Sequence, residues 1–422
     1  MMMGHSQPQR LGPIPKPFRL IALLMAAVLG GCSLSKPTLP VMLYLAVSIE
    51  DDRQITSETA LEFRKRFYNV VQQFRSLHPE VLVQTALYSE RDLTEQLRRR
   101  NKTGLGPDLI LTSGEMANAL LAAGLVDPLP ETPESKANTL PMLRLRLSNH
   151  RGQQSAQPLL VFPQLACFDR RQVQSTPTTL RDLLSAGAEG DPVGLSLNFR
   201  QLVWTAGALG AIPGLVTAVE GQPPSPAQQQ GILNWLSWLQ DANNQQRINF
   251  YPDQSTLRQG LAAGRLAWVT CSSSELQQLR QRMGAHLGVS ALPNGEAHQA
   301  SPLNRLRVLA LGRNSSPRQR QMALALTQFS ITPLLQRNLT LESLSLLPVN
   351  PHVNVPVQSS QVLTALVQAK EQAANSAPLL SHLHSDDPRV AQLEAVLVPL
   401  VFGVITPEMA RDQVIAVLRR TR

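Results

Sequence analysis

Short apolar runs alternate with longer amphipathic segments in the first third of the chain. Val41–Val47, Val81–Leu87 and Leu109–Thr112 are apolar over lengths typical of strands. Between them, apolar residues recur at helical spacing in Thr59–Leu77 and Asp92–Arg100. This alternation of strands and helices predicts a parallel sheet with right-handed connections.

The sharpest local pattern lies in Gly104–Pro130. After the strand that ends at Thr112, Ser113 is placed to cap a helix, and the acidic Glu115 falls in its first turn. Ligands of α/β sheets bind beyond the carboxyl ends of the strands, so this corner is predicted to face a ligand. For Glu115, a ligand contact and a simple carboxylate at a helix N-terminus remain equal alternatives.

A long apolar strand, Leu159–Phe168, is interrupted by Pro163. Proline is unfavourable in a central strand, because it cannot donate a hydrogen bond, unless the strand changes neighbours there. Asp191–Leu197 is a further predicted strand, followed by the helix Phe199–Leu209. The length of 422 residues favours two lobes, each with its own core.

The N-terminus has the features of a secretory signal. Three basic residues precede the apolar run Leu20–Leu29, which is too short to span a bilayer, and small residues then lead to Cys32. This arrangement resembles the lipobox of bacterial lipoproteins. We therefore expect a signal peptide over residues 1–32, a lipidated (palmitate-bearing) Cys32 as the mature N-terminus, and a tether over residues 33–40.

Several motifs together resemble the extracellular solute-binding proteins of ABC importers, specifically the carbohydrate-binding cluster that includes maltodextrin-binding proteins. The resemblance extends over the whole mature chain. It is carried, in order, by Gly104–Leu129, Leu159–Phe168, Thr178–Leu184, Leu257–Val269, His286–Pro293, Leu346–Val349 and Phe402–Ala410. It implies an α/β fold of the periplasmic-binding-protein-like type II, with two lobes joined by crossover strands and a ligand cleft between them. Lobe 1 is expected over 41–162 and 293–347, and lobe 2 over 163–292 and 348–422.

The resemblance also implies which residues contact the ligand. Matching them to this sequence gives Ser48, Glu50, Ser113, Glu115, Phe162, Gln164, Trp204, Trp268, Ser272 and Ser273. For Trp204, a place in the core is an equal alternative, because tryptophan is highly buried on average. The chain departs from the family pattern at Gln164, where an aromatic residue is usual, and at Cys271–Ser274, where the family has a Gly-x-Trp motif.

Composition changes this interpretation in two ways. The formal charge of +9 is scattered along the chain and forms no clustered patch, so we expect no nucleic-acid partner. Aromatic residues make up only 4% of the chain, whereas sugar sites rely on aromatic faces. A polyol or another polar solute therefore stays open beside a sugar.

No catalytic or cofactor-binding motif is present: the sequence contains no H-E-x-x-H, G-x-S-x-G or P-loop pattern. His382–Asp387 has metal-binding residue types but is interpreted as a solvated loop. We thus expect no enzyme activity, no cofactor and no metal. Cys167 and Cys271 either pair in an oxidising compartment or remain two buried thiols, and the sequence does not decide between these states.

The resulting hypothesis is a lipid-anchored protein of the cell envelope, facing the periplasm or the exterior. It would capture a small polar solute, a sugar or polyol, and deliver it as a monomer to ABC permease subunits through hinge closure. The alternative is an envelope scaffold or sensor lipoprotein that keeps the fold without transport.

Overall fold

The computed structural model describes residues 40–49, 57–149, 151–244, 248–383 and 387–420. Residues 41–422 form one compact unit. The predicted lipidation site Cys32, the candidate ligand residue Glu50 and residues 384–386 of the His382–Asp387 segment lie outside the described residues.

The first sheet has six strands in the order β11-β4-β10-β3-β1-β2. β1 pairs in parallel with both β2 and β3, which confirms the parallel arrangement predicted for the first three strands. β10 lies antiparallel between β3 and β4. The strands are β1 (Val41–Ile49), β2 (Val81–Ser89), β3 (Leu109–Ser113), β4 (Gln157–Phe162), β10 (Arg305–Leu311) and β11 (Leu347–Pro348).

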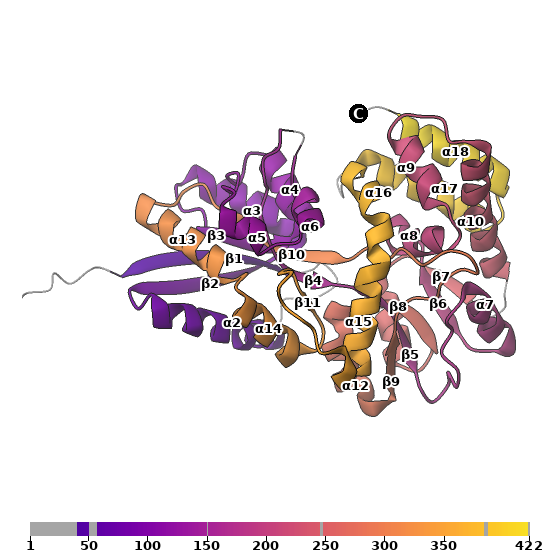
Figure 1. Cartoon of the computed structure of the whole chain (residues 1–422), viewed down its shortest axis with the longest axis horizontal. Coiled ribbons are helices and arrows are strands. Elements are labelled where there is room, and N and C mark those ends of the chain that lie inside the picture. Colours follow the sequence, from indigo (N-terminus) through magenta and orange to yellow (C-terminus); the bar gives the residue numbers. More distant parts are fainter. Residues whose placement is uncertain (1–39, 50–56, 150, 245–247, 384–386, 421–422) are drawn as a thin grey trace, which may run out of the picture. The chain divides into compact units, whose positions relative to one another are not determined.

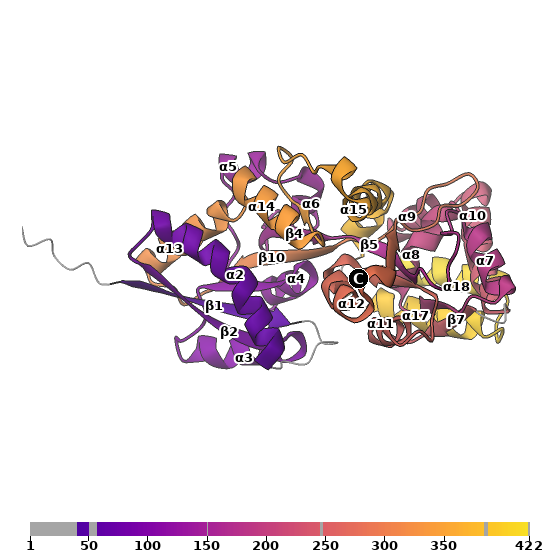
Figure 2. The same cartoon turned by 90° about the horizontal axis from the view of Figure 1, so that it is seen from below.

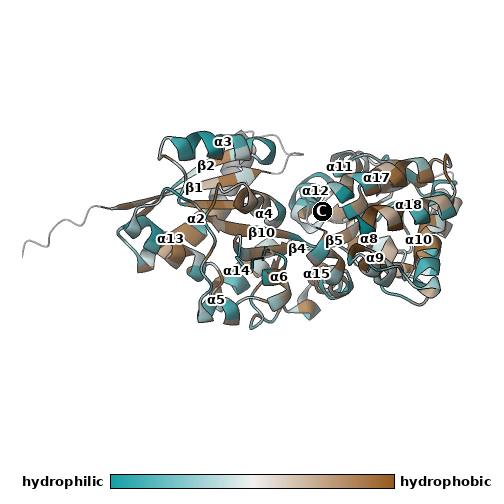
Figure 3. Cartoon of the chain, turned by 90° about the horizontal axis from the view of Figure 1, so that it is seen from above, coloured by the Kyte–Doolittle hydropathy of each residue, from teal (hydrophilic) through white to brown (hydrophobic). Residues whose placement is uncertain are grey.

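Both faces of this mixed sheet are covered by helices, as its parallel strands require. Alternate residues of β1 point to opposite faces: Leu43 and Leu45 pack with α2 (Ser57–Leu77) and α13 (Pro317–Phe329), and Ala46 with the opposite layer. That layer consists of α3 (Glu90–Lys102) and α4 (Gly114–Ala122), which lie above the sheet in Figure 1. Seen from below, α2 lies in front of β1 and β2 (Figure 2). The apolar strand β1 contrasts with the largely hydrophilic helix α3 in Figure 3.

The interruption at Pro163 is where the chain leaves the first sheet. β4 ends at Phe162, and β5 (Gln164–Asp169) begins one residue later as a strand of the second sheet. The expectation that the strand changes neighbours at this proline is confirmed.

The second sheet has five strands in the order β7-β6-β8-β5-β9, namely β5 with β6 (Val193–Ser196), β7 (Ile248–Tyr251), β8 (Trp268–Ser272) and β9 (Leu287–Ser290). One face packs on α8 (Phe199–Ala208), α10 (Pro226–Asn244), α17 (Pro388–Val401) and α18 (Pro407–Arg419). The other face packs on α11 (Gln254–Ala262), α12 (Leu276–Met283) and α15 (Gln361–Gln372).

Shorter helices complete the chain. They are α5 (Pro133–Ala137), α6 (Pro141–Leu145), α7 (Leu180–Glu189), α9 (Ile212–Val219), α14 (Pro333–Ser343), α16 (Ala377–His382) and the 3₁₀ turns η1 (Ser273–Glu275), η2 (Gly284–His286), η3 (Val357–Ser359) and η4 (Ala373–Ser376). The expected α/β fold with two sheets joined by crossover strands is confirmed. The exact lobe boundaries stay a prediction.

Cys167 and Cys271 form a disulfide, with their Cα atoms 5.8 Å apart. They lie on the antiparallel neighbours β5 and β8, and both side chains are buried. The bond closes a loop with a sequence separation of 104 residues. Of the two states that the sequence left open, the structure shows the paired one.

Removing this disulfide should destabilise the fold markedly. Chain-entropy arguments assign nearly 5 kcal/mol to a loop of about 100 residues, and measured losses for native disulfides are about 2–5 kcal/mol. We expect the double variant Cys167→Ala/Cys271→Ala to lose about that much free energy of unfolding in urea titrations. An unchanged unfolding midpoint, with the oxidised bond confirmed in the parent by mass spectrometry, would contradict this.

A carboxylate terminates β5. Asp169 is buried, and its Oδ1 accepts from the Arg171 backbone N–H (3.0 Å) while its Oδ2 accepts from Nη2 of the Arg171 guanidinium (2.6 Å). The hydrogen bonds from the Arg171 side chain outweigh the cost of burial and lower the pKa of Asp169 to about 2.

The low pKa of Asp169 predicts how stability depends on pH. Because the folded-state pKa lies below the unfolded value, the contribution is complete above about pH 4 and is lost as the pH falls towards about 2. Since Arg171 is largely exposed, we expect Asp169→Asn to cost only about 1–2 kcal/mol at pH 7. Urea titrations from pH 7 to pH 2 should show a smaller acid-induced loss in this variant than in the parent. Parallel pH profiles would refute the assignment.

Candidate ligand-binding site

The carboxyl ends of the parallel strands in both sheets meet at the Pro163 crossover. In the first sheet β1, β3 and β4 run in the same direction, so Ser48, Ser113 and Phe162 lie at one edge. In the second sheet β6, β7 and β8 run in the same direction and β8 pairs antiparallel with β5, so their carboxyl ends share an edge with Gln164. Since only Pro163 separates Phe162 from Gln164, these two edges adjoin.

Ser48 is held firmly at the end of β1. Its hydroxyl donates to Thr112 Oγ1 (2.9 Å), and the guanidinium of Arg307 on β10 donates to the Ser48 hydroxyl (3.3 Å) and carbonyl (2.8 Å). The side chain is buried. Ser48 therefore belongs to a polar network that ties β1, β3 and β10 together at this edge.

Ser113 caps α4, as predicted from the sequence. Its hydroxyl oxygen accepts from the Met116 backbone N–H (3.2 Å), which satisfies one of the free donors at the helix start. The same hydroxyl donates to the carboxylate of Glu90, the first residue of α3. The Ser113 hydroxyl thus joins the N-terminal ends of α3 and α4 beside the edge of the sheet.

Glu115 makes the most informative polar contact of this region. Its Oε1 lies 2.7 Å from Nη2 of Arg200 on α8 and 3.6 Å from Nη2 of Arg146. Burial opposes ionisation of the carboxyl, but the positive charges of Arg200 and Arg146 outweigh it, so the pKa of Glu115 lies below its usual value. The contact with Arg200 joins a helix on the first sheet to a helix on the second.

Gln164 fills a similar role at the start of β5. Its Nε2 donates to both the backbone carbonyl and the side-chain oxygen of Gln201 (2.9 Å each), and its Oε1 accepts from the Leu303 backbone N–H (3.4 Å). Its neighbour Phe162 is buried. The glutamine that replaces the usual aromatic residue therefore connects the crossover to α8 and to the segment that leads into β10.

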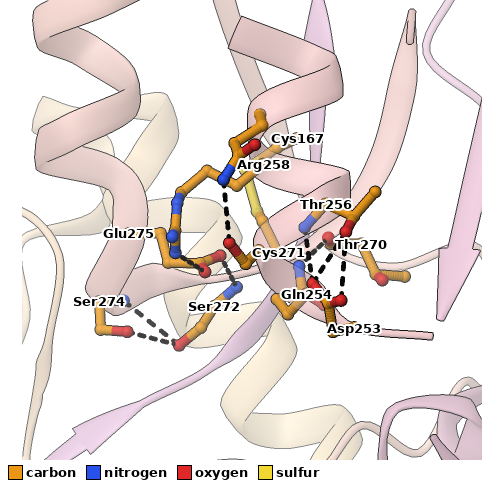
Figure 4. Close-up of polar contacts among 12 residues, drawn as sticks. Cys167, Asp253, Gln254, Thr256, Arg258, Thr270, Cys271, Ser272, Ser274 and Glu275 are labelled. Carbon is orange, nitrogen blue, oxygen red and sulfur yellow. Dashed lines mark hydrogen bonds and ion pairs between the residues drawn. A yellow bond between two sulfur atoms is a disulfide. The ribbon is translucent and has the colours of Figure 1, made fainter. Parts of the chain in front are cut away.

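β8 ends at Ser272, which caps the 3₁₀ turn η1 that begins with Ser273. Figure 4 shows Ser272 with Ser274 and Glu275. The carboxylate of Glu275 accepts from the Ser272 backbone N–H (3.0 Å) and from Nη1 of Arg258 (2.8 Å), in a buried ion pair. The Ser272 hydroxyl interacts with the hydroxyl of Ser274 (2.9 Å). The buried Ser273 Oγ has no hydrogen-bond partner among the described residues, and its N–H donates to the carbonyl of Pro163 (2.9 Å).

The two tryptophans of the predicted set do not join this group. Trp204 and Trp268 are 0% and 1% exposed and pack in the core of the second sheet, with ring centroids 6.4 Å apart. Trp268 begins β8, roughly 13 Å of strand before Ser272 at about 3.3 Å per residue. For Trp204, the core position is the alternative that the structure shows. Neither ring offers a surface for a solute to stack on in this structure.

Sequence reasoning missed several residues of this region. Arg200 lies in the first turn of α8, which follows β6 and is capped by Asn198, so the rule that located Ser113 could also have located Arg200. Arg307 lies near the amino end of an antiparallel strand, where that rule does not apply. Arg146 follows the short helix α6 in an irregular segment, and no pattern in the sequence marks it.

Comparison with known proteins assigns the class. A family model described as bacterial extracellular solute-binding protein matches residues 69–373, and the chain belongs to this family. A search of curated proteins finds no match. The chain is thus an extracellular solute-binding protein of bacterial type, as the sequence motifs indicated.

Solved structures share the fold at low identity. The acarbose-binding GacH receptor of Streptomyces glaucescens is 15% identical, with a TM-score of 0.67 over 89% of this chain and 97% of that one. A cyclo/maltodextrin-binding protein in complex with maltotetraose is 17% identical, with a TM-score of 0.67 over 91% and 98%. An ABC transporter solute-binding protein of Thermotoga lettingae bound to α-D-tagatose is 13% identical, with a TM-score of 0.62 over 90% and 100%.

The buried Arg258–Glu275 pair should be essential for the turn that carries Ser272 and Ser273. Glu275→Gln removes the charge that faces Arg258 and weakens the cap on Ser272. Hydrogen bonds to charged groups are worth about 1.5–3 kcal/mol, so we expect a loss of that order in free energy of unfolding. The matched control is Glu95→Gln, whose carboxylate contacts two arginines at the surface and should leave the unfolding midpoint unchanged. Equal effects of the two variants would contradict a special role for Glu275.

Proposed function

We propose that this chain captures a small polar solute, a sugar or a polyol, between its two sheets and delivers it to an ABC permease. The observation that carries the proposal is the junction of both carboxyl edges at Pro163. The proposed ligand contacts come from the elements at these adjoining edges: Ser48, Ser113 and Glu115 from the first sheet and its helices, and Gln164, Ser272 and Ser273 from the second. Family membership supports a solute as the ligand.

Hinge closure is the proposed mechanism. The connections between the sheets are few, and the one at Pro163 is a single residue, so small backbone rotations there would change the distance between the two edges. A solute that contacts both edges would select the state in which they are close. Glu115 on α4 and Arg200 on α8 already contact each other, and these helices pack on different sheets.

The proposed location is the cell envelope, with the chain anchored as a monomer through a lipid on Cys32. The family is extracellular, and the buried disulfide suits an oxidising compartment. None of the helices in the described part of the chain is long and apolar enough to cross a bilayer.

An envelope scaffold or sensor without transport is the second candidate. The burial of Trp204 and Trp268 favours it, because neither tryptophan then offers a stacking surface for a sugar ring. Solute binding separates the two candidates.

Solute binding should be visible as thermal stabilisation. A true ligand at about 100 times its Kd adds roughly 2.7 kcal/mol, so the chain from Ser33 onward should melt at a higher temperature with one class of compound in a panel of sugars, polyols and amino acids. Gln164→Leu should weaken that binding up to about tenfold, because it removes hydrogen-bonding groups from the crossover. The matched control Gln259→Leu, at an exposed position of α11, should bind like the parent.

The outcome is decisive in either direction. A selective shift that Gln164→Leu reduces supports solute capture at the crossover. If no compound raises the melting temperature of folded protein that was shown by mass spectrometry to carry no ligand, the scaffold is favoured instead.

A further inference from the structure

Two guanidinium groups converge on one carboxylate at the proposed site. Nη2 of Arg200 and Nη2 of Arg146 lie 2.7 Å and 3.6 Å from the same oxygen of Glu115. Nη1 of Arg146 also donates to the backbone carbonyl of Asn304 (2.9 Å), which carries no charge. Within the described residues, this trio therefore has two positive charges for one negative charge.

The surroundings of the trio make its unbalanced charge unfavourable. The side chains of Arg146 and Arg200 are only 13% and 21% exposed, so water screens their mutual repulsion incompletely. Burial lowers the pKa of Arg146, Glu115 raises it, and the charge of Arg200 lowers it further. Two arginines held together in this way form a natural receptor for a second anion, because each guanidinium presents paired donors that match an oxyanion.

Two unsatisfied polar atoms belong to residues beside the Pro163 crossover. Oδ1 of Asn304 and Oγ of Ser273 are buried and lack a hydrogen-bond partner in the described part of the chain. Their backbone groups do make contacts here: the carbonyl of Asn304 accepts from Arg146, and the N–H of Ser273 donates to the carbonyl of Pro163. Buried polar groups are normally paired, so an amide and a hydroxyl in this state indicate a missing polar partner.

We propose that the solute carries an oxyanion group, the carboxylate of a sugar acid or the phosphate of a sugar phosphate, and that Arg146 and Arg200 bind this group. The inference rests on the proposed function and specifies its substrate class. Glu115 competes with the solute for the two guanidinium groups, and so acts as a specificity-determining residue. The burial of Trp204 and Trp268 agrees with recognition by charge instead of stacking on these rings.

The test compares matched neutral and acidic solutes by isothermal titration calorimetry on the chain from Ser33 onward. The pairs are glucose with glucuronate, galactose with galacturonate, maltose with maltobionate, and glucose with glucose 6-phosphate. We expect an acidic member to bind at least tenfold more tightly than its neutral partner, with an affinity that falls as salt is raised. Preference for the carboxylates or for the phosphate identifies which oxyanion is bound.

Single variants test whether the two arginines bind the acidic group of the solute. Arg146→Gln and Arg200→Gln should each weaken binding of the acidic solute about 10- to 100-fold, as expected for a lost charge-assisted contact. Glu115→Gln should strengthen it, a gain that a merely structural role would not produce. The control Arg181→Gln removes an arginine whose ion pair with Glu296 lies at the surface, and it should change nothing. If Arg146→Gln does not fold, Arg200→Gln and Glu115→Gln decide the question.

Each outcome has one meaning. Neutral members that bind as tightly as their acidic partners, or acid binding that is unaffected by Arg200→Gln, overturn the inference and leave solute capture standing. If no compound of either kind binds, in this experiment or in the wider panel, the proposed function fails and the inference fails with it.

Discussion

The structure depends on a crossover in which one residue separates strands of two different sheets. Phe162 ends β4 and Gln164 begins β5, so the carboxyl edge of the first sheet adjoins the corresponding edge of the second at this point. Proline suits this position because the residue between two ladders needs no N–H for pairing, while its carbonyl still accepts a hydrogen bond from Ser273. The junction of the two edges, where we propose that the solute binds, is therefore a consequence of chain connectivity before any side chain is considered.

Interactions within the second sheet then fix the turn that faces this crossover. The disulfide joins β5 to β8 immediately before Ser272, and the Glu275 carboxylate accepts from both the Ser272 backbone N–H and Arg258 (Figure 4). A covalent bond at Cys271 and a buried charge pair at Glu275 lie on either side of the serines and leave them little freedom. The departure from the usual tryptophan motif at Cys271–Ser274 thus replaces an aromatic surface with a rigid polar turn.

How far the sequence predicts this arrangement differs between local and long-range features. The strands β1 and β3, the cap at Ser113 and the change of sheet at Pro163 follow from periodicity, capping and proline chemistry, which act over a few residues. The orientation of Trp204 depends on which face of α8 meets the core, and nearly every residue of that helix is buried, so no polar face marks the solvent side. Arg146 lies beside Glu115 only because of tertiary packing, so no local sequence pattern could have identified this contact.

The contact between Glu115 and Arg200 also suggests where the free energy of closure comes from. Both side chains keep about a fifth to a quarter of their surface exposed, and partly exposed ion pairs contribute little net stability because desolvation offsets much of the attraction. Such a pair can align the two sheets without holding them together by itself. A bound solute that satisfies Arg146, Arg200 and Asn304 would add the missing interactions, and closure would then be driven mainly by the solute and only slightly by the protein.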